Sequence, residues 1–200
     1  MELLELSEKK LHQENKKLYE IIKKKYDYDL VVFIARGAYM IGKDLAELNN
    51  VDMVEIFATR KGGKIKKIIN PILKIIPKSI KSFLRKKEFN SNYHEKNSER
   101  SISFNQNIWK KYHSCQKILL VDDSVDTGYS IKYAKEAIEN YFKKAKVKVA
   151  ALNYFEKSIN IIKTDFFLYS EKMMLGPWSN DSKENKKYIE EYNKWHNRQV

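Results

Sequence analysis

The chain has 200 residues, of which 42% are hydrophobic, and a formal net charge of +13. This length suits one domain with its own core, and no run of about 18 apolar residues indicates a membrane-spanning helix. The single Cys115 excludes an internal disulfide framework and a metal cluster built on thiolates. The acidic start of the sequence lacks the basic-then-apolar order of a secretion signal, so we expect a cytoplasmic protein.

The positive charge is concentrated in one segment. Eleven basic residues and no acid lie between Arg60 and Lys87, and 28 basic and 26 acidic residues remain elsewhere. The rest of the protein is therefore nearly neutral, and the binding that this charge implies belongs to residues 60–87.

In chain order, leucines and isoleucines at helical spacings predict a helix over the first 25 residues or so. A continuous apolar strand is expected at Leu30–Ala35, followed by a helix through about Leu48 and a strand at Met53–Ala58. Residues 60–112 form an insertion that interrupts this alternation of strands and helices. Further elements are expected at 118–121 (strand), 130–142 (helix), 147–152 (strand), 166–169 (strand) and 181–195 (helix).

This alternation predicts an α/β fold, with a parallel sheet flanked by helices. We expect a single domain over residues 1–200, with the insertion at 60–112 and a small hood over the site at about 153–180. In such sheets ligands bind beyond the carboxyl ends of the strands. The loops after Ala35 and after Val121 both lie there.

The segment from Lys117 to Ser130 carries the most chemistry. Its apolar strand ends in Asp122 and Asp123, and Thr127 and Gly128 precede a helix. The N–H groups of such a loop, with the positive helix end, form a cup for a phosphate. The paired acids suit a polyol or a magnesium ion. The alternative is a strand, turn and helix whose acids cap the helix in solvent.

This segment resembles the donor-binding signature of the type I phosphoribosyltransferases, and most closely that of the hypoxanthine and xanthine-guanine (6-oxopurine) branch. The resemblance implies binding of phosphoribosyl pyrophosphate (PRPP). Asp122 and Asp123 would lie beside the ribose hydroxyls and Mg²⁺, and Asp126 would be the catalytic base. The 5-phosphate would be surrounded by Asp126, Thr127, Gly128, Tyr129 and Ser130.

Arg36 and Gly37 follow the first expected strand, where a guanidinium and a close backbone can approach an anion together. In the resembled family, an Arg-Gly here forms the pyrophosphate loop, often with a cis peptide before the basic residue. Ala38 replaces a second glycine that is common there.

The resemblance weakens in the half that would bind the acceptor. Lys172–Ser179 resembles the segment that closes over the purine, but Phe155 stands where a lysine gripping the purine is expected, and Ser179 replaces an acid. The candidate acceptor-binding residues are Lys157, Met173, Met174 and Trp178. Trp178 is equally consistent with core packing.

These features predict an enzyme of nucleotide salvage, a transferase that moves 5-phosphoribosyl from PRPP to a purine-like base with Mg²⁺. One alternative is transfer to a sugar hydroxyl in surface-polysaccharide biosynthesis. Another is a regulator that senses PRPP and binds nucleic acid through residues 60–87.

Within residues 60–87, apolar side chains recur at three- and four-residue steps, and Pro71 and Pro77 divide them into two short amphipathic pieces. Such pieces favour a lid, packing in a homodimer, or contact with an anionic membrane at the inner membrane face, with nucleic acid less favoured. His12 and His196 are expected to be in solvent.

Overall fold

The computed structural model describes residues 2–60 and 99–199. The chain divides into two compact units, residues 1–58 with 102–200, and residues 59–101. The expected basic amphipathic segment therefore lies outside the described residues, apart from Arg60. Among the helices of the described ranges, none combines the length and the apolar character that crossing a bilayer requires.

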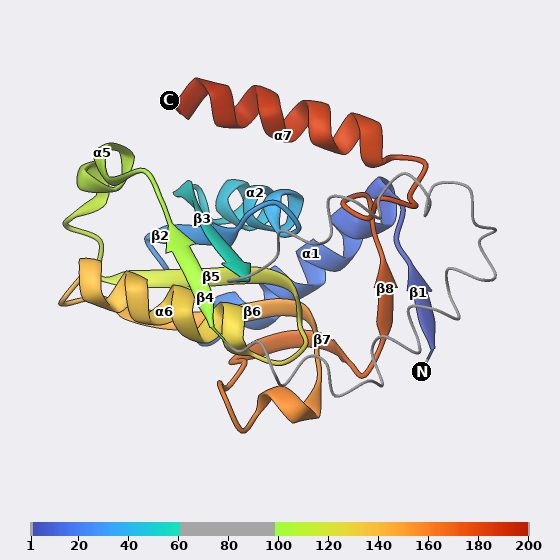
Figure 1. The fold of residues 1–200 in the computed structure, drawn as a ribbon, viewed down its shortest axis with the longest axis horizontal. Coiled ribbons are helices and arrows are strands. Elements are labelled where there is room, and N and C mark those ends of the chain that lie inside the picture. Colours follow the sequence, from blue (N-terminus) through green and yellow to red (C-terminus); the bar gives the residue numbers. More distant parts are fainter. Residues whose placement is uncertain (1, 61–98, 200) are drawn as a thin grey trace. The chain divides into compact units, whose positions relative to one another are not determined.

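The elements follow one another in a largely regular strand–helix order (Figure 1). In sequence they are β1 (Leu3–Glu5), α1 (Glu8–Lys23), β2 (Leu30–Ile34), α2 (Tyr39–Asn49), β3 (Asp52–Arg60), β4 (Arg100–Ser103), α5 (Gln106–Trp109), the 3-10 helix η3 (Lys110–Tyr112), β5 (Lys117–Val125), α6 (Tyr129–Tyr141), β6 (Lys146–Tyr154), the 3-10 helix η4 (Glu156–Ser158), β7 (Phe166–Ser170), β8 (Met173–Leu175) and α7 (Asn185–Gln199).

The main sheet has the strand order β4-β3-β2-β5-β6-β7. Strand β2 pairs in parallel with β3 on one side and with β5 on the other, and β5–β6 and β6–β7 are also parallel. The expected parallel α/β fold is confirmed. Because the chain runs outward in opposite directions from β2 and β5, their carboxyl ends open the crevice in which such sheets bind ligands.

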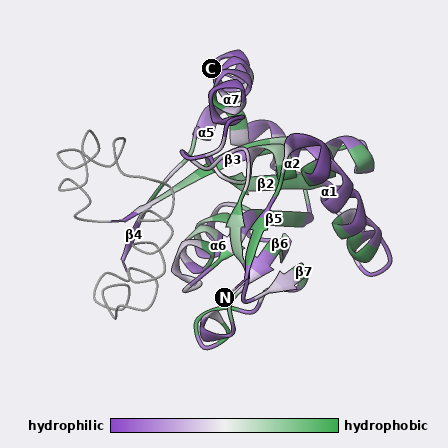
Figure 2. Cartoon of the chain, turned by 90° about the vertical axis from the view of Figure 1, so that its right-hand side faces the viewer, coloured by the Kyte–Doolittle hydropathy of each residue, from purple (hydrophilic) through white to green (hydrophobic). Residues whose placement is uncertain are grey.

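Helices cover both faces of this sheet, so its central strands are apolar on both sides. All five residues of β2 are buried. Val31 and Phe33 pack into a core with residues of α1, α2 and α7, whereas Leu30 and Val32 pack with α5 and α6. Figure 2 shows β2 and β5 mostly in hydrophobic green and α7 mostly in hydrophilic purple. Packing on both faces of the sheet thereby holds the strand ends, where the candidate site lies, in place.

The expected N-terminal helix is wrong at its first turn. Residues 3–5 form β1, which pairs in parallel with β8 in a separate two-stranded sheet. The helix begins only at Glu8, because the Ser7 hydroxyl accepts a hydrogen bond from the Lys10 N–H at 3.3 Å and caps it. The partner strand lies at the far end of the sequence, which helical periodicity does not detect.

Two strands also extend further than their apolar runs. Strand β5 continues through Asp122 to Val125, and β6 continues to Tyr154, because the two remain paired there. The C-terminal helix begins at Asn185, later than expected, and the Asn185 side chain donates to the carbonyls of Pro177 and Trp178. The acidic pair is thus held by a strand rather than by a loop.

Candidate active site

Asp122 and Asp123 lie near the carboxyl end of β5. Asp122 is only 8% exposed, and its Oδ1 accepts a hydrogen bond from the Asp123 N–H at 2.9 Å. Burial, together with the negative charge of Asp123, raises the pKa of Asp122 well above its usual value. Burial also raises the pKa of Asp123. A cation or hydroxyl donors placed at this pair would favour its charged form.

The loop after β2 meets this pair. The peptide between Ala35 and Arg36 is cis, as the resemblance implied. A Cβ atom added at Gly37 would lie 2.6 Å from Asp123 Oδ1, so the carboxylate occupies the space that a side chain would need. Arg36 is exposed. The structure thus brings together the two segments singled out for the donor, although they are far apart in sequence.

The backbone of this loop is held from its other side by a residue that sequence reasoning missed. The Tyr188 hydroxyl of α7 donates to the Arg36 carbonyl oxygen at 2.5 Å and lies 2.9 Å from the Gly37 carbonyl oxygen. Burial and the nearby Asp123 charge raise the pKa of Tyr188, so it stays a protonated donor. The only signal for it in sequence was a row of aromatic residues at helical spacing.

The expected phosphate cup is a tight turn at residues 126–128. Gly128 has a φ of 83°, in the left-handed region that favours glycine. A Cβ there would also lie 2.8 Å from Ile162 Cγ2. Helix α6 begins directly afterwards at Tyr129, followed by Ser130. The N–H groups of the first turn of α6 face the N-terminal end of the helix, where the positive end of the helix dipole also lies.

Asp126 is exposed and stands at the start of this turn. Its Oδ1 accepts a hydrogen bond from the Ser124 hydroxyl at 3.1 Å, and the Ser124 oxygen in turn accepts from Asn153 Nδ2 at 3.0 Å. Asn153 is fully buried and also exchanges hydrogen bonds with the Lys172 backbone, each of 3.1 Å. Asp126 is therefore tied through two side chains to the segment that enters β8.

Among the candidates for acceptor binding, Trp178 lies next to the acids. Hydrogen bonding by its side chain works against the rise in the pKa of Asp123. Its ring also fills the space where a Cβ of Gly176 would be, and it packs partly buried against the core. Trp178 therefore fits both the core-packing and the acceptor-binding interpretation, because its ring packs on the core and its N–H lies beside Asp123.

The other candidates divide between two segments. Met173 and Met174 are half-buried on β8, beside Leu3 and Leu4 of β1. Lys157 is exposed on η4, with its ammonium 5.6 Å from the centre of the Phe155 ring. The neighbouring Ser158 carbonyl oxygen would lie 3.2 Å from a Cβ at Gly128, which places η4 against the turn of the expected phosphate cup.

Ser124 and Asn153 were not singled out in the sequence either. Asn153 follows an apolar run directly, and a polar residue at such a strand end was the available signal. The expectation of solvent exposure is confirmed for His12, whose side chain is 44% exposed, but it is wrong for His196, which is half-buried. Their Nδ1 atoms lie 2.6 Å from Asp44 Oδ2 and 2.5 Å from Glu55 Oε1, and both of these carboxylates are buried.

No protein-family model and no curated protein sequence matches the chain. Solved structures do match. A purine phosphoribosyltransferase from Pyrococcus horikoshii has a TM-score of 0.61 at 15% identity, covering 91% of this chain and 97% of its own. The xanthine-guanine-hypoxanthine phosphoribosyltransferase of Helicobacter pylori has a TM-score of 0.60 at 14% identity, covering 92% and 99%.

A hypothetical protein from Neisseria gonorrhoeae, solved with bound ppGpp, is also similar over nearly the whole length. Its TM-score is 0.57 at 12% identity, and the match covers 96% of this chain and 97% of that one. These likenesses concern the fold, which in this chain is a mostly parallel sheet flanked by helices. The chain therefore has the fold of the type I phosphoribosyltransferases.

Proposed function

We propose that this protein is a PRPP-dependent phosphoribosyltransferase, which moves 5-phosphoribosyl onto a purine-like base and releases pyrophosphate. One observation carries the proposal. The Asp123 carboxylate fits against the backbone of Gly37, where a side chain would collide at 2.6 Å. The proposed site for vicinal hydroxyls and the proposed pyrophosphate loop would thereby meet at the carboxyl ends of two adjacent parallel strands.

The donor would bind across this edge of the sheet. Asp122 and Asp123 would accept hydrogen bonds from the ribose hydroxyls, and the turn of Thr127 and Gly128 with the start of α6 would hold the 5-phosphate. Arg36 and the adjacent backbone N–H groups would hold the pyrophosphate. This arrangement supplies the alignment that displacement at C1 of the ribose requires.

Magnesium fits these residues in part. Among residues 2–60 and 99–199, no group of three or more acids, histidines or cysteines gathers to hold a metal, so a cation would use one or two carboxylates, water and substrate oxygens. Such a cation would offset the negative charges of Asp122 and Asp123, whose pKa values are raised by burial. When bound, Mg²⁺ would offset the charge of the leaving pyrophosphate.

In the reaction, the bond from C1 to the pyrophosphate oxygen breaks, and its electron pair leaves with the pyrophosphate. A bond forms between C1 and an acceptor nitrogen, and that nitrogen loses its proton to Asp126. Arg36 stabilises the charge that develops on the leaving group. Ser124 donates to Asp126 Oδ1 and so holds the carboxylate in place for the proton transfer.

The purine-like acceptor is supported by the names of two structures of the same fold and by Trp178, whose side chain lies at Asp123. Met173 and Met174 on β8, and Lys157 on η4, would complete the acceptor side. Such an enzyme would serve nucleotide salvage in the cytoplasm. Homodimer formation and contact with a membrane surface through residues 60–87 stay predictions.

The test is pyrophosphate release from PRPP and Mg²⁺ with guanine, hypoxanthine, xanthine or adenine. We expect release with at least one base, and the matching nucleoside monophosphate as co-product. Release with a saccharide hydroxyl alone would favour the polysaccharide alternative. If no acceptor supports release while nucleic acid binds in a salt-sensitive manner, the regulator would replace the enzyme.

A second candidate is binding of ppGpp, because one solved structure of this fold holds it. Its pyrophosphates would suit the same loop and turn. Competition between ppGpp and PRPP in a binding assay tests this, and simultaneous binding of both would contradict a shared site.

A further inference from the structure

The C-terminal helix α7 packs on the domain through one stripe of aromatic residues that carry O–H or N–H groups. Tyr188, Tyr192 and Trp195 recur along it at steps of four and three residues. Their rings surround Tyr39, the first residue of α2, with centroid distances of 6.0, 5.5 and 5.7 Å. Figure 1 shows α7 running over α2. The helix therefore packs on the segment that leaves the Arg36–Gly37 loop.

A buried acid of β3 fixes this helix in place. Glu55 is 7% exposed, and both of its carboxylate oxygens are taken by α7. The Tyr192 hydroxyl donates to Oε2 at 2.7 Å, and His196 Nδ1 lies 2.5 Å from Oε1. A buried carboxylate without these partners would destabilise the folded state. The contact therefore holds α7 in one position, which apolar packing alone would not do.

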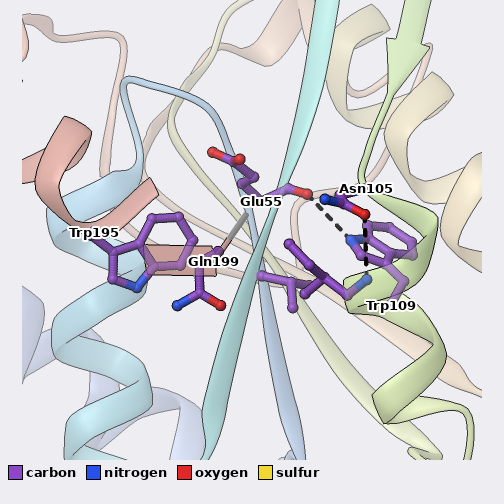
Figure 3. Close-up of a pocket in the computed structure, with 7 residues that line it drawn as sticks. Glu55, Asn105, Trp109, Trp195 and Gln199 are labelled. Carbon is purple, nitrogen blue, oxygen red and sulfur yellow. Dashed lines mark hydrogen bonds between the residues drawn. The ribbon is translucent and has the colours of Figure 1, made fainter. Parts of the chain in front are cut away.

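Residues of β3, α5 and α7 line a small pocket beside this contact. Figure 3 shows Trp195 and Gln199 on one side of β3 and Trp109 on the other, with Trp109 Nε1 donating to the Glu55 carbonyl oxygen at 3.3 Å. Trp195 also contacts Phe33 of β2 at 5.2 Å between ring centres. Strands β2 and β3 and helix α7 are therefore joined around the base of the loop.

Tyr188 is the member of the stripe that reaches the loop itself. Its hydroxyl lies 2.5 Å from the Arg36 carbonyl oxygen and 2.9 Å from that of Gly37. In a trans peptide the N–H points opposite to the C=O. A hydroxyl that holds the Arg36 carbonyl therefore directs the Gly37 N–H to the opposite side of the loop.

We propose that Tyr188 is a positioning residue for pyrophosphate, which orients the Gly37 N–H toward the leaving group from behind the loop. The inference rests on the proposed function, and it assigns a role in the donor site to a residue of α7 some 150 positions away. Tyr188 touches no substrate in this arrangement. It acts by keeping a small, glycine-containing loop in one conformation, which lowers the entropy lost on binding the anion.

The test compares Tyr188→Phe with Tyr192→Phe. Both remove one hydroxyl from the stripe and keep the ring, but only the first removes a bond to the loop. We expect Tyr188→Phe to raise the KM for PRPP and the Kd for magnesium pyrophosphate about tenfold, with kcat little changed. The variant loses one hydrogen bond that supports binding equally in the ground state and in the transition state. Tyr192→Phe should keep both constants and lower the thermal midpoint.

Calorimetry with pyrophosphate, steady-state kinetics and thermal unfolding provide the readouts. A merely structural role for Tyr188 would lower kcat through loss of folded protein and leave KM unchanged, and that outcome overturns the inference while the proposed function stands. Equal rises in KM for both variants would also overturn it, because docking of α7 in general would then be the cause. If the wild-type protein binds neither PRPP nor pyrophosphate, the proposed function fails and the inference with it.

Discussion

The carboxylate of Asp123 occupies the space beside Gly37 in which any other residue would place its Cβ, 2.6 Å from Oδ1. This contact joins the two segments that would hold opposite ends of the donor. It also explains in physical terms why a glycine stands at this position, although its φ does not lie in the left-handed region.

Gly37→Ala should therefore displace Asp123 and weaken PRPP binding by at least tenfold, while the thermal midpoint changes little. Gly42→Ala is the matched control, because its Cβ would lie 2.9 Å from Phe33 Cβ in the core of α2 and β2. We expect that variant to lose stability and to keep its PRPP affinity. Calorimetric titration and thermal unfolding separate the two effects, and unaltered PRPP binding by Gly37→Ala would contradict the contact's role.

Asp126→Asn should reduce kcat by about 10²–10⁴-fold, the range typical of a lost general base, and leave PRPP affinity within about twofold. Ser124→Ala should have a smaller effect on kcat, because it removes only the hydrogen bond that orients Asp126 Oδ1. Single-turnover kinetics with the best acceptor measures both variants. An equal loss of turnover and of PRPP affinity in Asp126→Asn would show that the residue binds the donor instead.

The pKa of Asp122, raised by burial and by Asp123, predicts a stability that depends on pH. Between its unfolded pKa near 3.8 and its higher folded value, the folded chain holds a proton that the unfolded chain has lost. Stability contributed by Asp122 is therefore present at low pH and is lost as the pH rises through that window.

Asp122→Asn removes this ionisation and keeps an oxygen that can accept from the Asp123 N–H. Without ligands, the variant should melt a few degrees higher than the wild type at pH 7, since about 1 kcal/mol moves Tm by roughly 2–4 °C in a chain of this size. At pH 4 the difference should shrink. A variant that is less stable at pH 7 would mean that the carboxylate is satisfied in its charged form.

Asn153→Ala should loosen the segment that enters β8. The substitution leaves the Lys172 N–H and its carbonyl without their side-chain partner, and the loss of buried hydrogen bonds costs about 1–3 kcal/mol. Hydrogen exchange should become faster at Met173–Leu175, and the KM for the acceptor should rise more than that for PRPP. Unchanged exchange in β8 would argue against the link between Asn153 and the hood.

Much of the α/β fold could be predicted because its strands are buried on both faces. Leu30–Ile34 and Ile118–Val121 are continuous apolar runs, and such runs followed by helical periodicity indicate parallel strands. The predicted positions of the strand ends were less accurate. Asp122 to Val125 continue β5 through pairing with β6, and polar side chains at a strand end carry no periodic signal for that pairing.

The residues of the candidate site also divide into those that the sequence indicates and those that depend on tertiary contacts. The candidate donor residues lie on short local motifs at the ends of β2 and β5, so the sequence could predict that the structure brings these motifs together. The sequence carried only weak signals for Tyr188 and Asn153, and the role of Glu55 could not be identified, because each gains its role from a partner that only the tertiary structure brings near. His196 is an example, since it contacts Glu55 across 141 positions of sequence.

Strand β1 has a consequence for how the protein matures. Leu3 pairs with Met173, 170 residues later, so a nascent chain would leave the ribosome exit with its first strand still waiting for a partner. Closing so long a loop is slow compared with local helix formation. The two-stranded sheet of β1 and β8 can therefore form only after Met173–Leu175 has been synthesised, and a bulky group attached directly before Leu3 would hinder that pairing.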